Sequence, residues 1–200
     1  MIVIGITGPT GAGKTTVLNV LKELDGCILD ADAVYHELLE SDLTLRSGLE
    51  ERFGLLTRED GTIDRKKLGS IVFHDPAALA ELNDISHKWV VAEISQRLAQ
   101  AQVSGVRIAA IDAVALFESG AAELCRTTVA VIAPAEVRVR RIMAREGISE
   151  EYARARIAAQ KPPEWFEERC DHILCNDGGR EELEERARAL FKSIIPKEEL

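Results

Sequence analysis

Residues 8–15, GPTGAGKT, carry the glycines and side chains of a phosphate-binding loop, because they fill each fixed position of G-x-x-x-x-G-K-[ST]. Glycines let the backbone turn its N–H groups toward phosphate oxygens. Lys14 would place a positive charge on the β- and γ-phosphates of a nucleotide, and the Thr15 hydroxyl would bind a magnesium ion carried in with it. Thr16, the next residue, is a further hydrogen-bond donor for the phosphates. The stretch therefore predicts an anionic, phosphate-bearing ligand.

The segments on either side of the loop have the order that this motif requires. Residues 2–7, IVIGIT, are apolar and β-branched and predict a buried strand, whereas residues 17–24 carry apolar side chains at helical spacing. The helix that follows adds the partial positive charge of its N-terminus. A glycine-rich turn without a ligand is the alternative, but four fixed positions in the right context favour phosphate binding.

Two carboxylates follow the next predicted strand, residues 27–29. A strand after a helix of this length indicates a parallel crossover, and ligands of parallel sheets lie at the carboxyl edge. Asp30 or Asp32 would then orient or deprotonate an acceptor hydroxyl in line with the γ-phosphate. Aspartate also caps helices well, so one of the two is expected to cap the next helix.

Residues 34–103 predict a mostly helical insertion, broken at residues 57–62 by turn-forming residues. Its second half predicts one long amphipathic helix with Pro76 in the first turn. The insertion is too long for a plain crossover, so we expect it to build the pocket for a second substrate. His87 and Lys88 are candidate contacts there, although a lone helical histidine is more often structural or solvated.

Three further strands complete the predicted sheet: residues 107–111, 128–133 and 172–175. Asp112, directly after the first of these, occupies a position where a carboxylate often serves the magnesium shell, with helix capping as the alternative. Asn176 begins a turn after the last strand and would hydrogen-bond adenine, unless the turn binds nothing. The expected fold is α/β, a five-stranded parallel sheet flanked by helices.

Six arginines crowd into nineteen residues of an otherwise acidic chain: Arg138, Arg140, Arg141, Arg145, Arg154 and Arg156. Arg141 and Arg145 are four residues apart, so they share a helix face from which guanidinium groups can hold a triphosphate. Pairing with nearby glutamates on a solvated helix is the alternative. Gly147 and its neighbours interrupt the helices as a hinge in a mobile lid would, and closure would exclude water.

The composition limits the classes of function. A formal charge of −9 over 200 residues argues against a nucleic-acid binder or a membrane-surface protein. No apolar run reaches bilayer length and no basic leader precedes the first strand, so we expect a cytoplasmic protein. No obligate protein partner is evident from the sequence. The four scattered cysteines predict reduced, mostly buried thiols. A metal site at residues 170–175 is disfavoured because no second ligand pair accompanies it.

Several stretches together resemble the dephospho-coenzyme A kinase family, over most of the chain. In chain order these stretches are GITG at 5–8, DAD at 30–32, Asp112 with LFE at 116–118, RIMAR at 141–145, RIAAQ at 156–160, and Asn176-x-Gly178 with Leu183 beyond it. The chain departs from the family pattern at Pro9-Thr10, at Val114-Ala115 and at Lys88. The order and spacing of the matching stretches make the resemblance specific.

The resemblance implies phosphorylation of the ribose 3′-hydroxyl of dephospho-coenzyme A by ATP, with Mg²⁺, giving coenzyme A and ADP. It implies one kinase domain over residues 1–200, with an acceptor-binding insertion at about 31–105 and a lid at about 135–165. The expected site residues are, for catalysis, Asp32, Lys14 and Arg141; for ATP, Gly11, Ala12, Gly13, Lys14, Thr15, Thr16, Arg141, Arg145, Asn176 and Gly178; for the acceptor, Asp32, His87 and Asp112; and for the metal, Thr15 and Asp112.

Two other functions fit the phosphate-binding loop alone. One is another small-molecule kinase with this loop, acting on a nucleoside, a nucleotide or shikimate. The other is a nucleotide-dependent switch, which is disfavoured because the sequence lacks the guanine-reading N-K-x-D motif. Dependence of ADP formation on the acceptor distinguishes all three.

Overall fold

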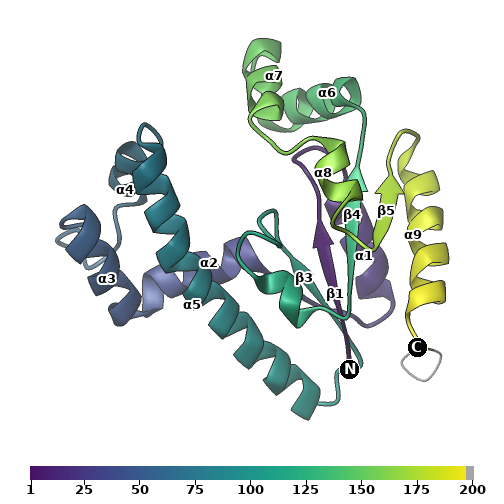
Figure 1. Ribbon diagram of the computed structural model, residues 1–200, viewed down its shortest axis with the longest axis horizontal. Helices are drawn as coiled ribbons and strands as arrows, with labels where there is room; N and C mark the ends of the chain where they lie inside the picture. The colour runs from purple at the N-terminus through teal and green to yellow at the C-terminus, as the bar shows by residue number, and fades with distance from the viewer. Residues whose placement is uncertain (197–200) are drawn as a thin grey trace.

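The computed structural model describes residues 1–196. Its centre is a parallel sheet of β1 (Ile2–Thr7), β2 (Cys27–Asp30), β3 (Ile108–Asp112), β4 (Thr127–Ile132) and β5 (His172–Cys175), in the order β2-β3-β1-β4-β5 (Figure 1). The register sets Asp112 beside Asp30 on one side and beside Ile6 on the other. This arrangement confirms the predicted α/β fold and brings both carboxylates to the edge where the phosphate-binding loop leaves β1.

Helices cover both faces of the sheet. On one face Ile108 and Ala110 pack with α1 (Lys14–Glu23) and α9 (Arg180–Ile194). On the other face Ala109 and Ile111 belong to the core shared with the helical insertion. Successive side chains of a strand point to opposite faces, and a sheet buried on both faces needs apolar residues at each position. That requirement explains why the strands are continuous apolar runs.

The insertion consists of α2 (Ala31–Ser41), α3 (Leu43–Phe53), α4 (Arg65–Val72) and α5 (Pro76–Val103), which stand to one side of the sheet (Figure 1). Each helix begins at an aspartate whose side chain accepts backbone hydrogen bonds: Asp30, Asp42, Asp64 and Asp75. The helical insertion and its long last helix therefore agree with the sequence expectation. Leu79, near the start of α5, is 37% exposed.

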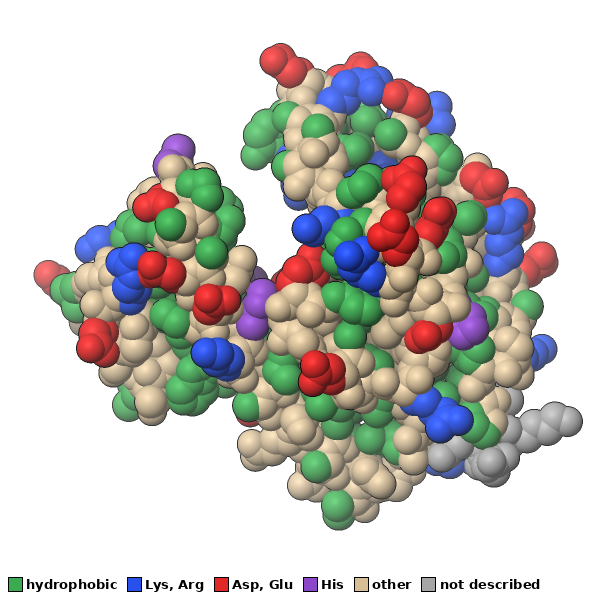
Figure 2. All heavy atoms as spheres, viewed as in Figure 1, with side chains coloured by type: hydrophobic (Ala, Val, Ile, Leu, Met, Phe, Trp, Pro, Cys, Tyr) green, Lys and Arg blue, Asp and Glu red, His purple; other side chains and the backbone are tan. Residues whose placement is uncertain are grey.

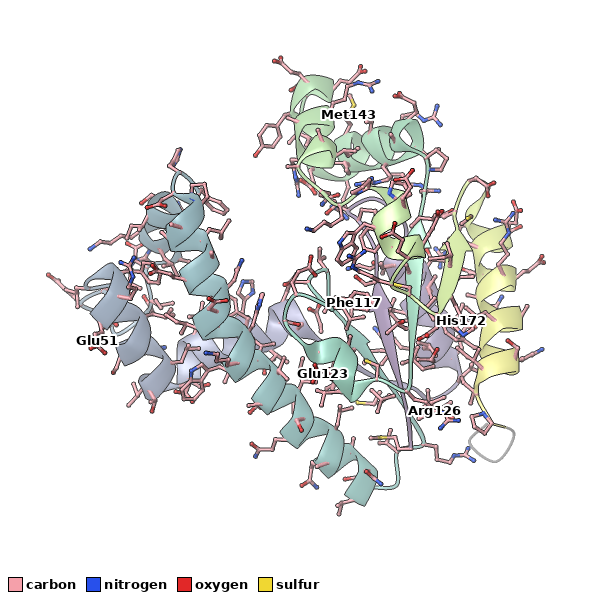
Figure 3. All side chains as sticks on the ribbon, viewed as in Figure 1. Glu51, Phe117, Glu123, Arg126, Met143 and His172 are labelled. Carbon is pink, nitrogen blue, oxygen red and sulfur yellow. The ribbon has the colours of Figure 1, made fainter. Side chains whose placement is uncertain are left out.

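A smaller helical part lies above the carboxyl edge of β4 (Figure 1). It contains α6 (Ala135–Glu146), α7 (Glu150–Ala158) and α8 (Pro163–Glu167). Gly147 ends α6 with a positive φ of 67°, and the Ser149 side chain caps α7. Val139, Ile142 and Ala153 form a separate small core, against which Met143 packs (Figure 3). This core makes α6 and α7 one packed unit joined at a glycine.

Candidate active site

Two glycines of the phosphate-binding loop occupy backbone positions that no other residue would tolerate. Gly8 has φ 135°, and a Cβ there would overlap the Val131 carbonyl oxygen. Gly13, which precedes α1 with φ 109°, would place its Cβ against the Asn176 side-chain nitrogen. The motif glycines are therefore required both by the turn and by the close approach of β4 and the segment after β5.

Side chains from two other parts of the chain donate hydrogen bonds to carbonyl oxygens of the loop. Arg141 lies on α6, with Nη1 3.4 Å from both the Gly11 and the Ala12 carbonyl oxygens. The Asn176 side-chain nitrogen donates to the Ala12 carbonyl oxygen at 2.6 Å, and its Oδ1 accepts from Arg141 Nη2 at 3.1 Å. Asn176 is only 4% exposed. Both ends of its amide thus help to fix the loop, a positioning role that the expected adenine contact did not anticipate.

A second set of contacts fixes Thr10. Arg138 donates from Nε to the Thr10 carbonyl oxygen at 2.9 Å and from Nη2 to Gln160. Gln160 in turn accepts from the Thr10 amide at 3.2 Å and donates to its hydroxyl at 2.9 Å. Arg138 is 4% exposed, burial lowers its pKa, and it has no ion-pair partner among residues 1–196. Sequence reasoning placed it in the arginine cluster but gave no sign of this unpaired buried charge.

Lys14 and Asp112 form an ion pair beneath the loop, with Nζ 3.1 Å from Oδ1. Burial raises the pKa of Asp112, the nearby Lys14 ammonium opposes that shift, and the charges of Asp30 and Asp32 reinforce it. Oδ1 is buried, and the Lys14 ammonium is its partner. The other carboxylate oxygen, Oδ2, has no hydrogen bond or ion pair within residues 1–196, so it is available for a further cation.

The structure separates the roles of Asp30 and Asp32. Asp30 caps α2, since its Oδ1 accepts from the Asp32 amide at 2.9 Å and from the Ala33 amide at 3.1 Å. Asp32 lies in the first turn, and its exposed carboxylate has no partner in the described part of the chain. One aspartate of the pair is thus a cap, as expected, and the other is free for chemistry.

Two cavities meet at Val114. The first, of about 260 Å³, is lined by Lys14, Thr15, Arg141 and Arg145 together with the loop. The second, of about 270 Å³, lies between α2, α5 and the segment after β3. Figure 2 shows the hollow between the helical insertion and the rest of the molecule. Because Val114 lines both cavities, ligands bound in them would be neighbours.

The second cavity contains two of the expected acceptor residues. Asp32 lines it from α2 and His87 from α5, with Ser86 and Asn83 close by. Burial lowers the pKa of His87, against the opposing effect of Glu118. His87 is therefore held toward its neutral form, in which the ring both donates and accepts hydrogen bonds.

The remaining arginines differ in how fully they are paired. Arg145 lines the loop cavity and is mostly exposed, and within residues 1–196 its ion-pair partner is Glu146, at 2.5 Å. Arg154 reaches Glu136 at 2.7 Å and Glu150 at 2.8 Å. The expected alternative of a solvated, glutamate-paired helix thus describes Arg154, whereas Arg141 faces the loop.

The other expected residues have simple placements. The Thr16 amide donates to the Gly13 carbonyl oxygen at 3.0 Å, and Thr15 is exposed at the helix start. Gly178 is exposed beyond Asn176. The four cysteines are free, and Cys175 is exposed, so the expectation of mostly buried thiols is wrong there. Burial raises the pKa of Cys125 to about 12.

Comparisons with known proteins identify the family. The family model for dephospho-CoA kinase matches residues 2–182. The dephospho-CoA kinase of Geobacter sulfurreducens is 36% identical over 197 residues, covering 98% of this chain and all of the relative. The crystal structure of TT1252 from Thermus thermophilus aligns with a TM-score of 0.76 at 34% identity, covering 98% of both chains. Dephospho-CoA kinase from Campylobacter jejuni aligns with a TM-score of 0.71 at 26% identity, covering 96% of both. The chain therefore belongs to the dephospho-CoA kinase family.

Proposed function

We propose that this chain transfers the γ-phosphoryl group of ATP to the ribose 3′-hydroxyl of dephospho-coenzyme A, giving coenzyme A and ADP. The observation that carries the proposal is the meeting of two cavities at Val114, with the phosphate-binding loop in one and Asp32 in the other. Membership of the dephospho-CoA kinase family supports this reaction over that of another small-molecule kinase.

Asp32 is the residue that we assign to the acceptor hydroxyl. Its carboxylate is unpaired at the cavity wall, whereas the carboxylate of Asp30 is occupied by the helix cap. A free carboxylate can accept the hydrogen bond of the 3′-hydroxyl and then its proton, as its oxygen bonds to phosphorus. His87, on the opposite wall, and Asp112 complete the acceptor-binding set.

The loop and the arginines act on ATP. We assign the binding of its phosphates to residues 11–16 and to the side chains of Arg141 and Arg145. Lys14 and Arg141 place positive charge where negative charge develops on the transferring group, which is the largest contribution available to phosphoryl transfer. Asn176 and Gly178 remain proposed on the adenine side, and Asn176 acts mainly by holding the loop.

The residues near Lys14 fit a magnesium ion. Thr15 and Asp112 line a common cavity, and they offer a hydroxyl and a carboxylate oxygen that suit a hard cation. The buried Asp112 carboxylate, which pairs with Lys14 through Oδ1 alone among residues 1–196, supports this assignment. When bound, Mg²⁺ would neutralise phosphate charge.

The larger parts of the molecule receive corresponding roles. We assign residues of about 31–105 to acceptor binding and those of about 135–165 to a lid that hinges near Gly147.

Among residues 1–196, no helix combines the length and the apolar character that a membrane span requires. A cytoplasmic location fits an enzyme that uses ATP and whose four cysteines are free.

The test measures ADP formation with Mg-ATP and dephospho-coenzyme A, with adenosine 5′-phosphate, or without an acceptor. We expect stoichiometric turnover with dephospho-coenzyme A; equal turnover with adenosine 5′-phosphate, or without acceptor, would refute the assignment. Asp32→Asn should abolish single-turnover transfer with ATP affinity within a few-fold of the parent. Asp30→Asn is the matched control, because asparagine caps a helix about as well as aspartate.

A further inference from the structure

Tyr35 lines the acceptor cavity and carries a buried hydroxyl. It lies on α2, three residues after Asp32, so the two side chains share one helix face. Its hydroxyl is buried and has no hydrogen-bond partner in the described part of the chain. Burial raises the pKa of Tyr35 to about 12, so the hydroxyl keeps its proton at neutral pH and can donate. A buried donor without a partner is unfavourable in the free protein.

A further cavity begins on the other side of Tyr35. It has a volume of about 250 Å³ and lies between α2, α4 and the start of α5. Its lining is mostly apolar, with Arg65 and His36 as the basic side chains, and it shares Tyr35 and Leu82 with the acceptor cavity. Phe73 at its wall is 79% exposed, and Leu79 is 37% exposed. Tyr35 therefore stands between the cavity that contains Asp32 and an apolar surface that is open to a ligand.

The acceptor in the proposed function is much longer than its reacting nucleoside. Beyond the adenosine and its diphosphate it carries a pantetheine arm, which combines amide carbonyls with a geminal dimethyl group and a terminal thiol. If the ribose lies at Asp32, this arm has to leave the acceptor cavity along a neighbouring surface. A mostly apolar cavity beside a hydroxyl that has no partner complements such an arm.

We propose that Tyr35 is a specificity-determining residue for the acceptor: its hydroxyl donates a hydrogen bond to a carbonyl of the pantetheine arm, which crosses from the cavity at Asp32 to the apolar cavity beside α4. The inference rests on the proposed function. It assigns recognition of the non-reacting part of the substrate to Tyr35 and to the apolar wall at Leu79.

The first test compares Tyr35→Phe with the parent on two acceptors. With dephospho-coenzyme A, kcat/KM should fall about five- to tenfold, the scale of one neutral hydrogen bond. With adenosine 5′-phosphate, which lacks the arm, kcat/KM and calorimetric affinity should stay within about twofold. Tyr152→Phe is the matched control, because Tyr152 is 57% exposed on α7. Tyr152→Phe should leave kcat/KM unchanged for both acceptors.

A second measurement excludes a purely structural role. Because the Tyr35 hydroxyl has no partner among residues 1–196, Tyr35→Phe should melt at the same temperature as the parent or higher. Leu79→Gln, at an exposed position of similar volume, should raise KM for dephospho-coenzyme A severalfold and leave adenosine 5′-phosphate unchanged.

Three results would overturn the inference: an equal loss on both acceptors, a lower melting temperature for Tyr35→Phe, or an unchanged kcat/KM for dephospho-coenzyme A. These differ from failure of the proposed function, in which the parent protein itself would not phosphorylate dephospho-coenzyme A.

Discussion

Replacing Asn176 by alanine should make the phosphate-binding loop less ordered, although Asn176 lies outside the loop motif. The substitution removes the 2.6 Å hydrogen bond to the Ala12 carbonyl oxygen and the 3.1 Å hydrogen bond accepted from Arg141. The backbone bond from the Asn176 amide to Ile132 remains, so the end of β5 keeps its place. The change therefore acts on the loop and on Arg141.

The two lost hydrogen bonds set the size of the effect. A neutral hydrogen bond contributes about 1 kcal/mol net, and one to a charged group about 1.5–3 kcal/mol. Arg141 is half-buried, so water can replace part of its lost contact, and we expect a total of about 2–3 kcal/mol. For a chain of this size that loss lowers the melting temperature by about 5–10 °C. If bound ATP has to restore the order of the loop, part of this free energy is lost from binding. A loss of about 1.4 kcal/mol weakens ATP affinity tenfold.

The assay combines thermal unfolding with calorimetric titration of ATP. Gln100→Ala on the exposed part of α5 is the matched control for losing an amide, and it should change neither quantity. An unchanged melting temperature for Asn176→Ala would refute the positioning role. If ATP affinity fell without any loss of stability, Asn176 would instead contact the nucleotide directly, as the sequence alone predicted.

Three other changes test separate parts of the site. Lys14→Ala should lower turnover about a hundredfold or more at saturating ATP, the scale for one preorganised charge-stabilising group, and retention of turnover would remove Lys14 from the mechanism. Arg141→Ala should impair steady-state catalysis far more than Arg154→Ala, because Arg154 already pairs with two glutamates; the reverse order would refute the chosen helix face. Burial lowers the pKa of His87, so the unfolded chain binds more protons and stability should fall as the pH drops below about 6.5. Denaturant titrations of His87→Gln should show a weaker fall than those of the parent, with the exposed His74→Gln as control; equal slopes would contradict the shift.

The sheet could be predicted from the sequence because each strand is an apolar run that follows a helix or a turn. Its ends could not. The third strand was expected at residues 107–111 and is found at Ile108–Asp112, since Asp112 pairs with both Ile6 and Asp30. The residues that a strand pairs with decide where it ends, and the apolar pattern of that strand alone does not reveal those partners.

The site could be predicted where chemistry follows from adjacent residues. The phosphate-binding loop is one such stretch, and the pairing of a cap with a free carboxylate at residues 30–32 is another, although only the structure shows which aspartate is the cap. The contacts of Asn176 and Arg138 could not be predicted, because each joins segments more than a hundred residues apart.

These distant contacts also explain how the loop presents its N–H groups. A peptide unit is planar and trans, so a carbonyl held on one side directs the next residue's N–H to the other. The carbonyl oxygen of Thr10 is held by Arg138, and that of Ala12 by Asn176. The N–H groups of Gly11 and Gly13 are therefore directed away from these donors, and neither donates a hydrogen bond within residues 1–196. Two free donors on the inner surface are what an anionic ligand requires, and they are oriented before it arrives. The motif supplies the flexibility to adopt this turn, whereas α6 and the end of β5 supply the contacts that select it.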